Sequence, residues 1–264
     1  LRLVFLTAIF VTVTRFAIWL VTASGDLVTA REAAIGVQVA FVGLMGLIGM
    51  AGSIFAGVYL GAWVGIGAEA RQQKSFIWWI VNRLLFLAAV GSVQGFAQYY
   101  LADVLRVPKP ASATTMLMAA VAGFLIPSAL GGGYLADRIG RKRLVMLAGL
   151  VAAGGTVLLL FATSMPMVIV AGCIIGLGAG TFMATNWALG TDLAPKQDAG
   201  RYLGISNLAG AGAGIVGAGL GGPMADFFNA LQPGLGYLVI FALYAALFVL
   251  SSLTLSQVKL PAAA

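Results

Sequence analysis

Apolar residues run along almost the whole chain in stretches that short polar or turn-forming segments interrupt. Several stretches hold 18 or more residues without a charge, and about 20 such residues form a helix that crosses roughly 30 Å of hydrocarbon. The pattern predicts eight helices, at 1–23, 34–67, 76–104, 113–134, 143–163, 166–190, 200–227 and 234–256. The expected fold class is therefore an all-α, polytopic transmembrane helical bundle.

Turn-forming residues mark the breaks between these stretches. The clearest are Ser24-Gly25-Asp26, Pro108-Lys109-Pro110, Met165-Pro166, Pro195 to Asp198 and Gln232-Pro233-Gly234. The stretch 34–67 would be about 50 Å long as one helix, so it must tilt, break or protrude from the bilayer.

The composition narrows the classes of function. Of the 264 residues, 61% are hydrophobic and 9% are charged, whereas a soluble domain carries roughly a quarter charged residues. The net charge of +7 comes from basic residues in short linkers, so we expect no nucleic-acid partner. Histidine is absent, Cys173 is the single cysteine, and the sequence has no phosphate-binding loop motif. We therefore expect no metal, no cofactor and no enzymatic activity.

Lysine and arginine are distributed unevenly between the two sides of the predicted bundle. The side of the 135–142 loop holds ten of them and the opposite side only Arg31, Arg106 and Lys109. Basic residues concentrate on the cytoplasmic side of membrane proteins. The chain is thus expected to be a multi-pass protein, of a bacterial cytoplasmic membrane, with its C-terminus in the cytoplasm.

One of these basic loops has a distinctive residue order, from Gly133 through Tyr134-Leu135-Ala136-Asp137-Arg138-Ile139-Gly140 to Arg141-Lys142-Arg143. A tight turn is predicted there, because Gly140 can adopt positive φ and Asp137 can face the N-terminus of a helix. A plain basic turn at the membrane surface would have the same physical features.

The order of residues resembles the signature loop of the major facilitator superfamily, G-x-L-A-D-R-x-G-R-K-R, and every position of the motif is filled. The resemblance implies a conformational switch at Gly133, Asp137, Arg138, Gly140 and Arg141. In this switch Asp137 would steady one state by facing the N-terminal end of the helix at 1–23. In that family the loop lies between helices two and three and occurs again between helices eight and nine. Four predicted helices follow the loop in this chain, as four follow the second occurrence in the family. The resemblance therefore assigns the eight helices to positions five to twelve of a twelve-helix transporter, and implies further N-terminal helices of the same protein.

This assignment divides the chain into four parts. Residues 1–67 would end the N-terminal bundle, 68–75 would link the halves, 76–256 would form the C-terminal six-helix bundle, and 257–264 would be a cytoplasmic tail. The linker is shorter than the family leads us to expect. A second stretch, Asn186 to Pro195 followed by Gly200 to Gly204, resembles the turn between helices ten and eleven of sugar and cation symporters. Gly222-Pro223 resembles an antiporter motif, but the flanking residues depart from it.

Few polar residues lie within the predicted helices, and those that do are candidates for binding a solute. Gln94 and Gln98 lie four residues apart on one helix face, with Tyr99 beside them, and suit the hydroxyl groups of a sugar-like solute. Asn186 and Trp187 are further candidates near the cytoplasmic end of their helix. Hydrogen bonding between helices is the alternative for the two glutamines. Anchoring at the membrane interface is the alternative for Trp187.

Three other polar residues lie inside predicted helices. Asn207 fits either packing or a solute cavity. Arg15 would be costly near the centre of a bilayer without a partner, so it is a candidate for binding an anionic group. Arg83 lies about 10 Å by helical rise from the expected start of its helix, so its side chain is expected to reach the water there.

The resemblance implies a secondary transporter that moves a small solute by alternating access. The polar side chains favour a neutral, sugar-like solute, whereas Arg15 would favour an anion. Coupling to a proton or a sodium ion stays open, because none of the eight acidic residues lies in the middle of a predicted helix. The alternatives are a receptor or scaffold derived from a transporter, and an efflux carrier for drugs or organic anions. The expected partners are the solute and the lipid bilayer.

Overall fold

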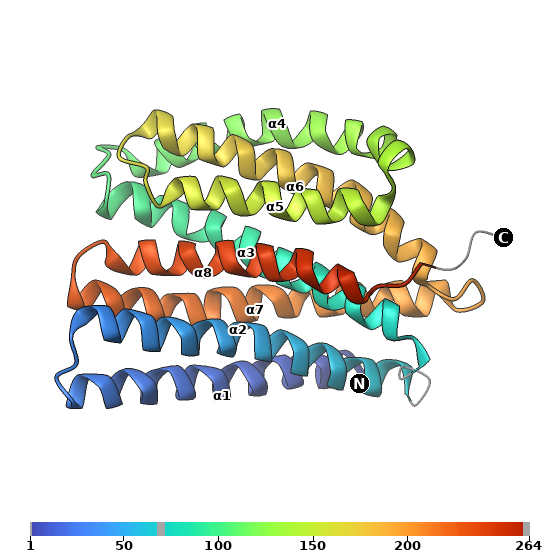
Figure 1. Ribbon diagram of the computed structural model, residues 1–264, viewed down its shortest axis with the longest axis horizontal. Helices are drawn as coiled ribbons and strands as arrows, with labels where there is room; N and C mark the ends of the chain where they lie inside the picture. Colours follow the sequence, from blue (N-terminus) through green and yellow to red (C-terminus); the bar gives the residue numbers. More distant parts are fainter. Residues whose placement is uncertain (1, 68–71, 261–264) are drawn as a thin grey trace.

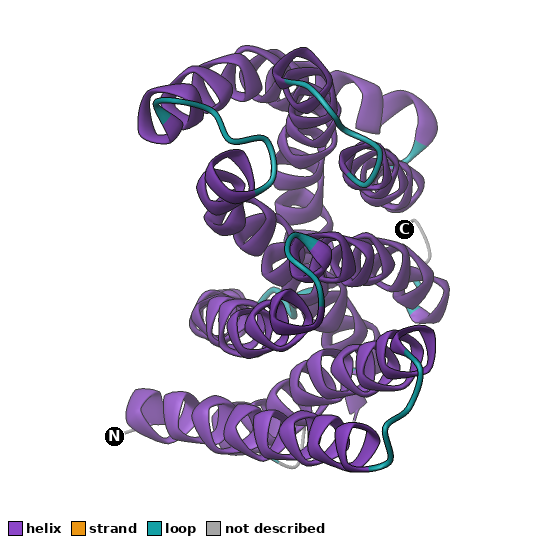
Figure 2. Ribbon diagram, turned by 90° about the vertical axis from the view of Figure 1, so that its left-hand side faces the viewer, coloured by secondary structure: helices purple, strands orange, loops and turns teal. Residues whose placement is uncertain are grey.

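The computed structural model describes residues 2–67 and 72–260 of the chain. Within these residues the chain forms eight α-helices and no strand, and the helices run along one common direction (Figures 1 and 2). The helices are α1 (Arg2–Ala30), α2 (Ile35–Ile66), α3 (Lys74–Asp103), α4 (Pro110–Ile139), α5 (Arg141–Leu159), α6 (Met165–Leu193), α7 (Ala199–Leu231) and α8 (Leu235–Thr254). The predicted all-α fold class is confirmed.

Seven of the described helices are long and apolar enough to cross a membrane. The set leaves out α7, which is rich in glycine but runs alongside the others for 33 residues (Figure 1). The predicted stretch 34–67 forms one unbroken helix of 32 residues, which is about 48 Å long by helical rise. This helix therefore exceeds the thickness of the hydrocarbon core, as its length in the sequence indicated.

The expected break at Ser24-Gly25-Asp26 is wrong, because α1 continues to Ala30. The hydroxyl of Ser24 donates a hydrogen bond to the Val21 carbonyl in the preceding turn, at 2.6 Å, which satisfies the hydroxyl inside the helix. A side chain on Gly25 would meet the ring of Phe227 at 2.9 Å, so this glycine serves close packing against α7. Residues typical of turns here support helix packing instead.

The basic loop is also shorter than predicted. Helix α4 continues through Asp137 and Arg138 to Ile139, and α5 begins at Arg141. The one residue between them, Gly140, has φ of 89° and ψ of 135°. A residue with a side chain rarely adopts this φ, so the predicted need for glycine at this position is confirmed. The turn between the two helices consists of this single residue.

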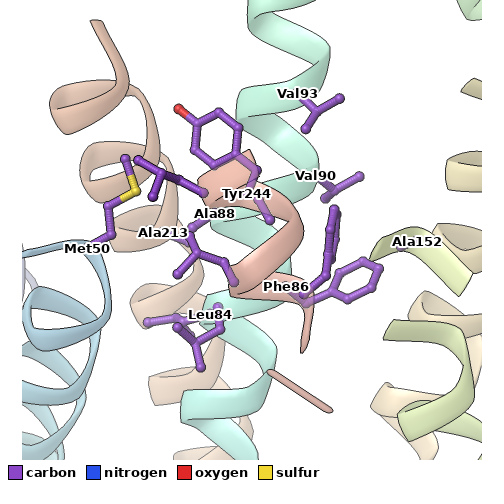
Figure 3. Packing of buried hydrophobic residues seen from close by; sticks show 14 of the residues in the cluster. Met50, Leu84, Phe86, Ala88, Val90, Val93, Ala152, Ala213 and Tyr244 are labelled. Carbon is purple, nitrogen blue, oxygen red and sulfur yellow. The ribbon is translucent and has the colours of Figure 1, made fainter. Parts of the chain in front are cut away.

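The helices pack in three groups, which lie one above the other in Figure 1. Helices α4, α5 and α6 form one group, α3, α7 and α8 the second, and α1 with α2 the third. Figure 3 shows the centre of the second group, where Leu84, Phe86 and Ala88 of α3 are fully buried. Helix α8 packs against α5 of the first group, and α7 packs against α1 and α2 of the third, so these two helices form the main links between the groups. Helix α3 makes smaller contacts with both other groups.

Helices α4, α5 and α6 of the first group approach one another closely at two glycines of α6. A Cβ atom on Gly176 of α6 would lie 2.7 Å from the Val121 carbonyl oxygen of α4. A Cβ atom on Gly178, on the other side of α6, would lie 2.7 Å from the Ala148 carbonyl oxygen of α5. The obstructing atoms belong to the backbone, so no side-chain rearrangement could make room. Small residues at such contacts let helices pack tightly where lipid provides no hydrophobic drive.

The connections alternate between the two ends of the bundle, so that neighbouring helices in the sequence run in opposite directions (Figure 1). The end at which α3 begins, together with the α4–α5 and α6–α7 connections, carries Lys74, Arg138, Arg141, Lys142, Arg143, Lys196 and Lys259. The opposite end carries Arg31, Arg106 and Lys109. The basic residues of the described chain are thus concentrated at one end.

The residues after α8 pack against this basic end. Leu255–Gln257 form a short 3-10 helix, and the carbonyl oxygen of Val258 accepts a hydrogen bond from Lys142 Nζ at 2.6 Å. The backbone nitrogen of Lys259 donates to Ser75 Oγ at 3.0 Å. Of the linker expected at 68–75 and the tail expected at 257–264, residues 68–71 and 261–264 lie outside the described residues.

Substitution of Gly176 by alanine should destabilise the protein. Its Cβ atom would overlap backbone atoms of α4, and overpacking of this kind costs about 1–3 kcal/mol. The control is Gly123→Ala on α4, where a Cβ atom meets nothing within 4 Å. Thermal unfolding in detergent should show a lower midpoint for Gly176→Ala and an unchanged or higher midpoint for Gly123→Ala. Equal midpoints for the two variants would contradict the close approach of α4 and α6.

Candidate functional site

One face of α3 combines exposed amides with glycines. Gly91, Gln94, Gly95 and Gln98 follow one another at helical spacing, and all four are exposed. Tyr99 beside them is 60% exposed. The structure thus leaves three of the predicted solute-binding residues accessible, with Gln94 and Gln98 on one face of α3. Tyr99 is rotated about 100° from Gln98 on the helix and lies beside Phe96.

Helix α7 presents a similar face. Gly204, Asn207, Ala211, Gly214 and Ala218 recur every three or four residues and are exposed. A Cβ atom on Gly204 or Gly214 would meet nothing within 4 Å. Asn207 is the one polar side chain among these five positions, so it stands out from a surface that is otherwise formed by backbone and methyl groups.

The two exposed faces lie on the same side of the contact between α3 and α7. The helices run parallel, since Leu87 of α3 lies against Gly210 of α7, while Ala88 and Ser92 lie against Gly217 farther along. Each residue turns an α-helix by about 100°. Seen along the common direction of the two helices, Gly91 and Gln98 are rotated to one side of the contact on α3. Gly214 is rotated in the opposite sense from the contact on α7. For parallel helices that face each other, these opposite rotations point to one side. Gln94, Gln98 and Asn207 therefore belong to one open face.

The inner wall of this face holds an arginine between two tryptophans. The guanidinium carbon of Arg83 on α3 lies 4.9 Å from the ring centroid of Trp187 on α6 and 5.9 Å from that of Trp79. Arg83 Nη1 donates to Asn186 Oδ1 at 3.4 Å, and its buried Nε atom has no hydrogen-bond partner among the described residues. The guanidinium of the partly exposed Arg83 is thus held against α6, and its extension to the water at the end of its helix stays a prediction.

A chain of side-chain hydrogen bonds joins α6, α3 and α8 behind this arginine. Asn186 Nδ2 donates to Asn82 Oδ1 at 2.7 Å, and Asn82 Nδ2 donates to the carbonyl oxygen and to Oγ of Ser251, both at 2.8 Å. Trp79 Nε1 donates to the Asn186 carbonyl at 3.0 Å. Asn82, Asn186 and Ser251 are fully buried. The amide of Asn186 thus takes part in hydrogen bonding between helices.

The predicted candidates therefore separate into two groups. Gln94, Gln98 and Asn207 are accessible on the open face, and Trp187 is half-buried at its inner wall. Asn186 is buried and engaged with Asn82, so in this structure it is closed to a solute.

Tyr100 and Arg15 are two further polar residues, and they differ in burial and in hydrogen bonding. Tyr100, next to the exposed Tyr99, is buried and donates to the Ala162 carbonyl at 2.7 Å, which ties α3 to the end of α5. Arg15 of α1 is exposed and forms no ion pair with the described residues. Arg15 thus presents a free guanidinium midway along α1.

The signature segment forms one ion pair in the described part of the chain. Arg141 Nη1, at the first residue of α5, lies 2.6 Å and 2.7 Å from the two carboxylate oxygens of Asp192 near the end of α6. It also donates to the Ala188 carbonyl at 3.3 Å. Both charged side chains are partly exposed, at 37% and 43%, so solvent screens the pair and its contribution to stability is modest.

The other signature residues are exposed. The guanidinium of Arg138 stacks on the ring of Tyr134, one turn earlier in α4, at 4.6 Å. A Cβ atom on Gly133 would meet nothing within 4 Å. Asp137 is exposed, and α4 lies on the opposite side of the bundle from α1 (Figure 1). The expected contact between Asp137 and the start of α1 is therefore absent among the described residues.

Sequence reasoning missed Asn82 and Ser251, which complete the buried network. Asn82 directly precedes Arg83, and an asparagine next to an arginine inside an apolar helix was the available signal. Ser251 gave no signal, because serine is common in membrane helices and its own backbone can satisfy the hydroxyl. The pairing of Arg141 with Asp192, which lie 51 positions apart, could not be found by spacing.

The profile of the Major Facilitator Superfamily matches residues 84–263. Over 149 residues the chain is 32% identical to the minor myo-inositol transporter IolF of Bacillus subtilis, which covers 55% of the chain and 32% of that protein. Over 143 residues it is 31% identical to the glucose transporter GlcP of Staphylococcus epidermidis, which covers 53% of the chain and 31% of that protein.

A eukaryotic protein gives a similar match. The myo-inositol transporter 2 of Schizosaccharomyces pombe is 30% identical over 144 residues, which make up 53% of the chain and 26% of that protein. The matched part of the chain thus spans about a third or less of the length of these relatives. Each of the three is named as a transporter.

Replacement of Asn186 by alanine should lower stability, since Asn82 Oδ1 and the Arg83 guanidinium each lose a partner. Hydrogen bonds between membrane helices contribute about 0.6 to 1.7 kcal/mol, so the expected loss is about 1–2 kcal/mol. Asn207→Ala should leave stability unchanged, because this side chain is exposed. Unfolding by denaturant in detergent measures both. A double-mutant cycle of Asn82→Ala with Asn186→Ala should show coupling, and strict additivity would contradict the network.

Proposed function

The chain belongs to the Major Facilitator Superfamily, and on this premise we propose that it forms helices five to twelve of a secondary carrier that works by alternating access. Such carriers expose a central site to one side of the membrane at a time by rocking two bundles against each other. In this proposal residues 1–67 belong to the N-terminal bundle, 68–75 link the two bundles and 76–256 form the C-terminal bundle. The open face of α3 and α7 is the part that faces the solute.

The observation that carries the proposal is the set of neutral amides on this open face. Gln94, Gln98 and Asn207 each offer hydrogen-bond donors and acceptors and carry no charge. Such groups match the hydroxyls of a polyhydroxylated neutral solute, which can donate and accept in the same way. The similarity to transporters named for myo-inositol and for glucose supports the same class of solute.

The glycines on the open face have a second role in the proposal. Gly91 lies one turn before Gln94, Gly95 lies between the two glutamines, and Gly204 and Gly214 flank Asn207 on α7. Their lack of side chains leaves the amides as the most prominent groups of this surface. A solute could then approach the helix backbones closely while it bonds to the amides.

The signature segment is the proposed switch. In this structure Arg141 and Asp192 join the first residue of α5 to the end of α6. Asp137 and Arg138 are exposed at the same end of the bundle and are accessible to other partners. We propose that the Arg141–Asp192 pair holds this end of the C-terminal bundle in one state of the transport cycle, and that its loss favours the other state.

Orientation and coupling are finer parts of the proposal. The concentration of basic residues at one end of the bundle supports a cytoplasmic location for that end, and for the C-terminus, in a bacterial inner membrane. Symport with a proton or a sodium ion would require a group that binds the cation. The described carboxylates within helices, Asp26, Asp103, Asp137, Asp192 and Asp226, all lie near helix ends. We assign none of them to coupling.

One observation favours a second candidate, an efflux carrier for organic anions. Arg15 and Arg83 lie well within helices, and neither forms an ion pair with the described residues. A cation in a membrane-embedded helix attracts a negatively charged group. In this case the solute would bind near Arg83 and Trp187 rather than at the two glutamines.

Counterflow in liposomes that contain the full-length protein tests the proposal. A panel of labelled solutes should include myo-inositol, glucose and an organic anion, each with the same unlabelled compound inside the vesicles. Accumulation of a neutral polyol or sugar is expected. Accumulation of the anion alone would favour the second candidate. Binding of a solute without counterflow would indicate a receptor or scaffold and would overturn the proposal.

Gln94→Ala and Gln98→Ala should each raise the KM for the transported solute about threefold to tenfold, because each removes a hydrogen bond worth about 0.5–1.5 kcal/mol. The control is Gln197→Ala, which removes an exposed amide from the turn between α6 and α7. Initial rates of uptake measure the KM of each variant. An unchanged KM in both α3 variants would remove these residues from the site.

Asp192→Asn should shift the protein between its conformations, because it removes the carboxylate that binds Arg141. The measurement is the rate at which a thiol reagent labels a cysteine placed at Ile139, an exposed position at the same end. A changed labelling rate with unchanged thermal stability is expected. Asp198→Asn, another exposed carboxylate near this end, should leave the rate unaltered. Equal rates in all three proteins would argue against the switch.

A further inference from the structure

A groove lies between α2 and α3, away from the open face that carries the glutamines. Its volume is about 600 Å³, within the range of about 300–1,000 Å³ that is typical of small-molecule sites. The groove is lined by Phe55, Tyr59, Lys74, Ile77, Trp78 and Val81. Lys74 lies 20 positions before Gln94 along α3, about 30 Å by helical rise. The groove is therefore separate from the proposed solute site.

The polarity of the groove changes along its length. Lys74 is the first residue of α3 and is exposed, so its ammonium group lies at the end of the bundle. Ile77, Trp78 and Val81 follow within about 10 Å of helical rise and form an apolar wall. The charged end thus lies at the membrane surface and the apolar end reaches into the hydrocarbon region, since α2 and α3 are both long and apolar enough to cross a membrane.

Aromatic side chains surround the charged end. Phe55 of α2 and Trp78 of α3 contact each other edge to face, with ring centroids 5.5 Å apart across the groove. Tyr59 and Trp63 of α2 are 57% and 59% exposed. Tyrosine and tryptophan concentrate at the level of lipid head groups, where an apolar ring and a polar tip are both accommodated. Their position marks this part of α2 as a segment in contact with the membrane interface.

We propose that this groove binds one phospholipid with an anionic head group. The phosphate lies at Lys74, and one acyl chain runs along Trp78, Ile77 and Val81. The ammonium group supplies the charge complementarity, because Lys74 forms no ion pair with the described residues. The groove runs from a charged end at the membrane surface to an apolar end in the hydrocarbon. A lipid in the leaflet on the Lys74 side has its head group and acyl chains in the same order.

An anionic lipid is a better match than the other occupants. A free inorganic anion would leave the apolar wall of Trp78 and Val81 exposed. A neutral lipid would fill the apolar part but leave the ammonium group without a partner, and basic residues next to a membrane gain from anionic lipids. The proposal requires only that α2 and α3 lie in the bilayer. It is independent of the solute, so a failure of the transport proposal would leave it standing.

Fluorescence quenching by brominated lipids tests the site. The full-length protein is placed in nanodiscs of phosphatidylcholine that contain increasing fractions of brominated phosphatidylglycerol or, separately, brominated phosphatidylcholine. The chain has five tryptophans, so the signal of Trp78 is obtained as the difference between the wild-type protein and Trp78→Phe. We expect brominated phosphatidylglycerol to quench Trp78 at lower fractions than brominated phosphatidylcholine does.

Substitutions of Lys74 identify the head-group contact. Lys74→Gln should raise the fraction of phosphatidylglycerol needed for half-quenching about fivefold, the effect of one lysine near an anionic surface. Lys74→Arg should retain the wild-type value, because it keeps the charge. The matched control is Lys196→Gln, which removes an exposed lysine from the turn between α6 and α7 and should leave the value unchanged.

Three results would overturn the proposal. Equal quenching by the two brominated lipids would show an ordinary lipid annulus without selection for charge. An unchanged value in Lys74→Gln, or an equal change in Lys196→Gln, would show that Lys74 is not the contact. An absence of quenching of Trp78 by either lipid would show that protein, and not lipid, covers the groove.

Discussion

The tight contact of α6 with its two neighbours is the constraint on which the polar chemistry of this bundle depends. Gly176 brings α6 against α4 and Gly178 brings it against α5, in both cases within contact of the opposing backbone. Lipid offers little hydrophobic gain for such packing, so dispersion forces between closely fitted surfaces must provide it. The depth of this contact determines how far the side chains at the end of α6 reach toward α3 and α5.

Three polar interactions follow from the position of α6. Asn186 reaches Asn82 of α3, Trp187 covers the guanidinium of Arg83, and Asp192 meets Arg141 of α5. The first is fully buried, whereas the second and third are partly exposed. Breaking a buried contact leaves unsatisfied groups in a medium of low polarity, whereas water replaces the exposed one at little cost. One helix therefore carries both a buried attachment to α3 and a partly exposed attachment to α5.

The sequence predicted those features that depend on local chemistry. The number of helices, the all-α class and the requirement for glycine at position 140 follow from apolar length and backbone freedom, and the structure confirms them. The accessibility of Gln94 and Gln98 agrees with their helical spacing, while their role in binding stays a prediction.

Contacts between segments that lie far apart in the chain could not be predicted from the sequence. Ser24 and Gly25 are residues typical of turns, yet packing against α7 keeps them helical. The side chain of Arg83 could not be placed without knowing that Trp187, 104 positions later, lies beside it. The contacts after α8 have a consequence for biosynthesis: Val258 and Lys259 join the beginnings of α5 and α3, and these hydrogen bonds cannot form until the ribosome has passed residue 259. The contacts that connect these two helix ends to the residues after α8 can therefore form only after all eight helices have been synthesised.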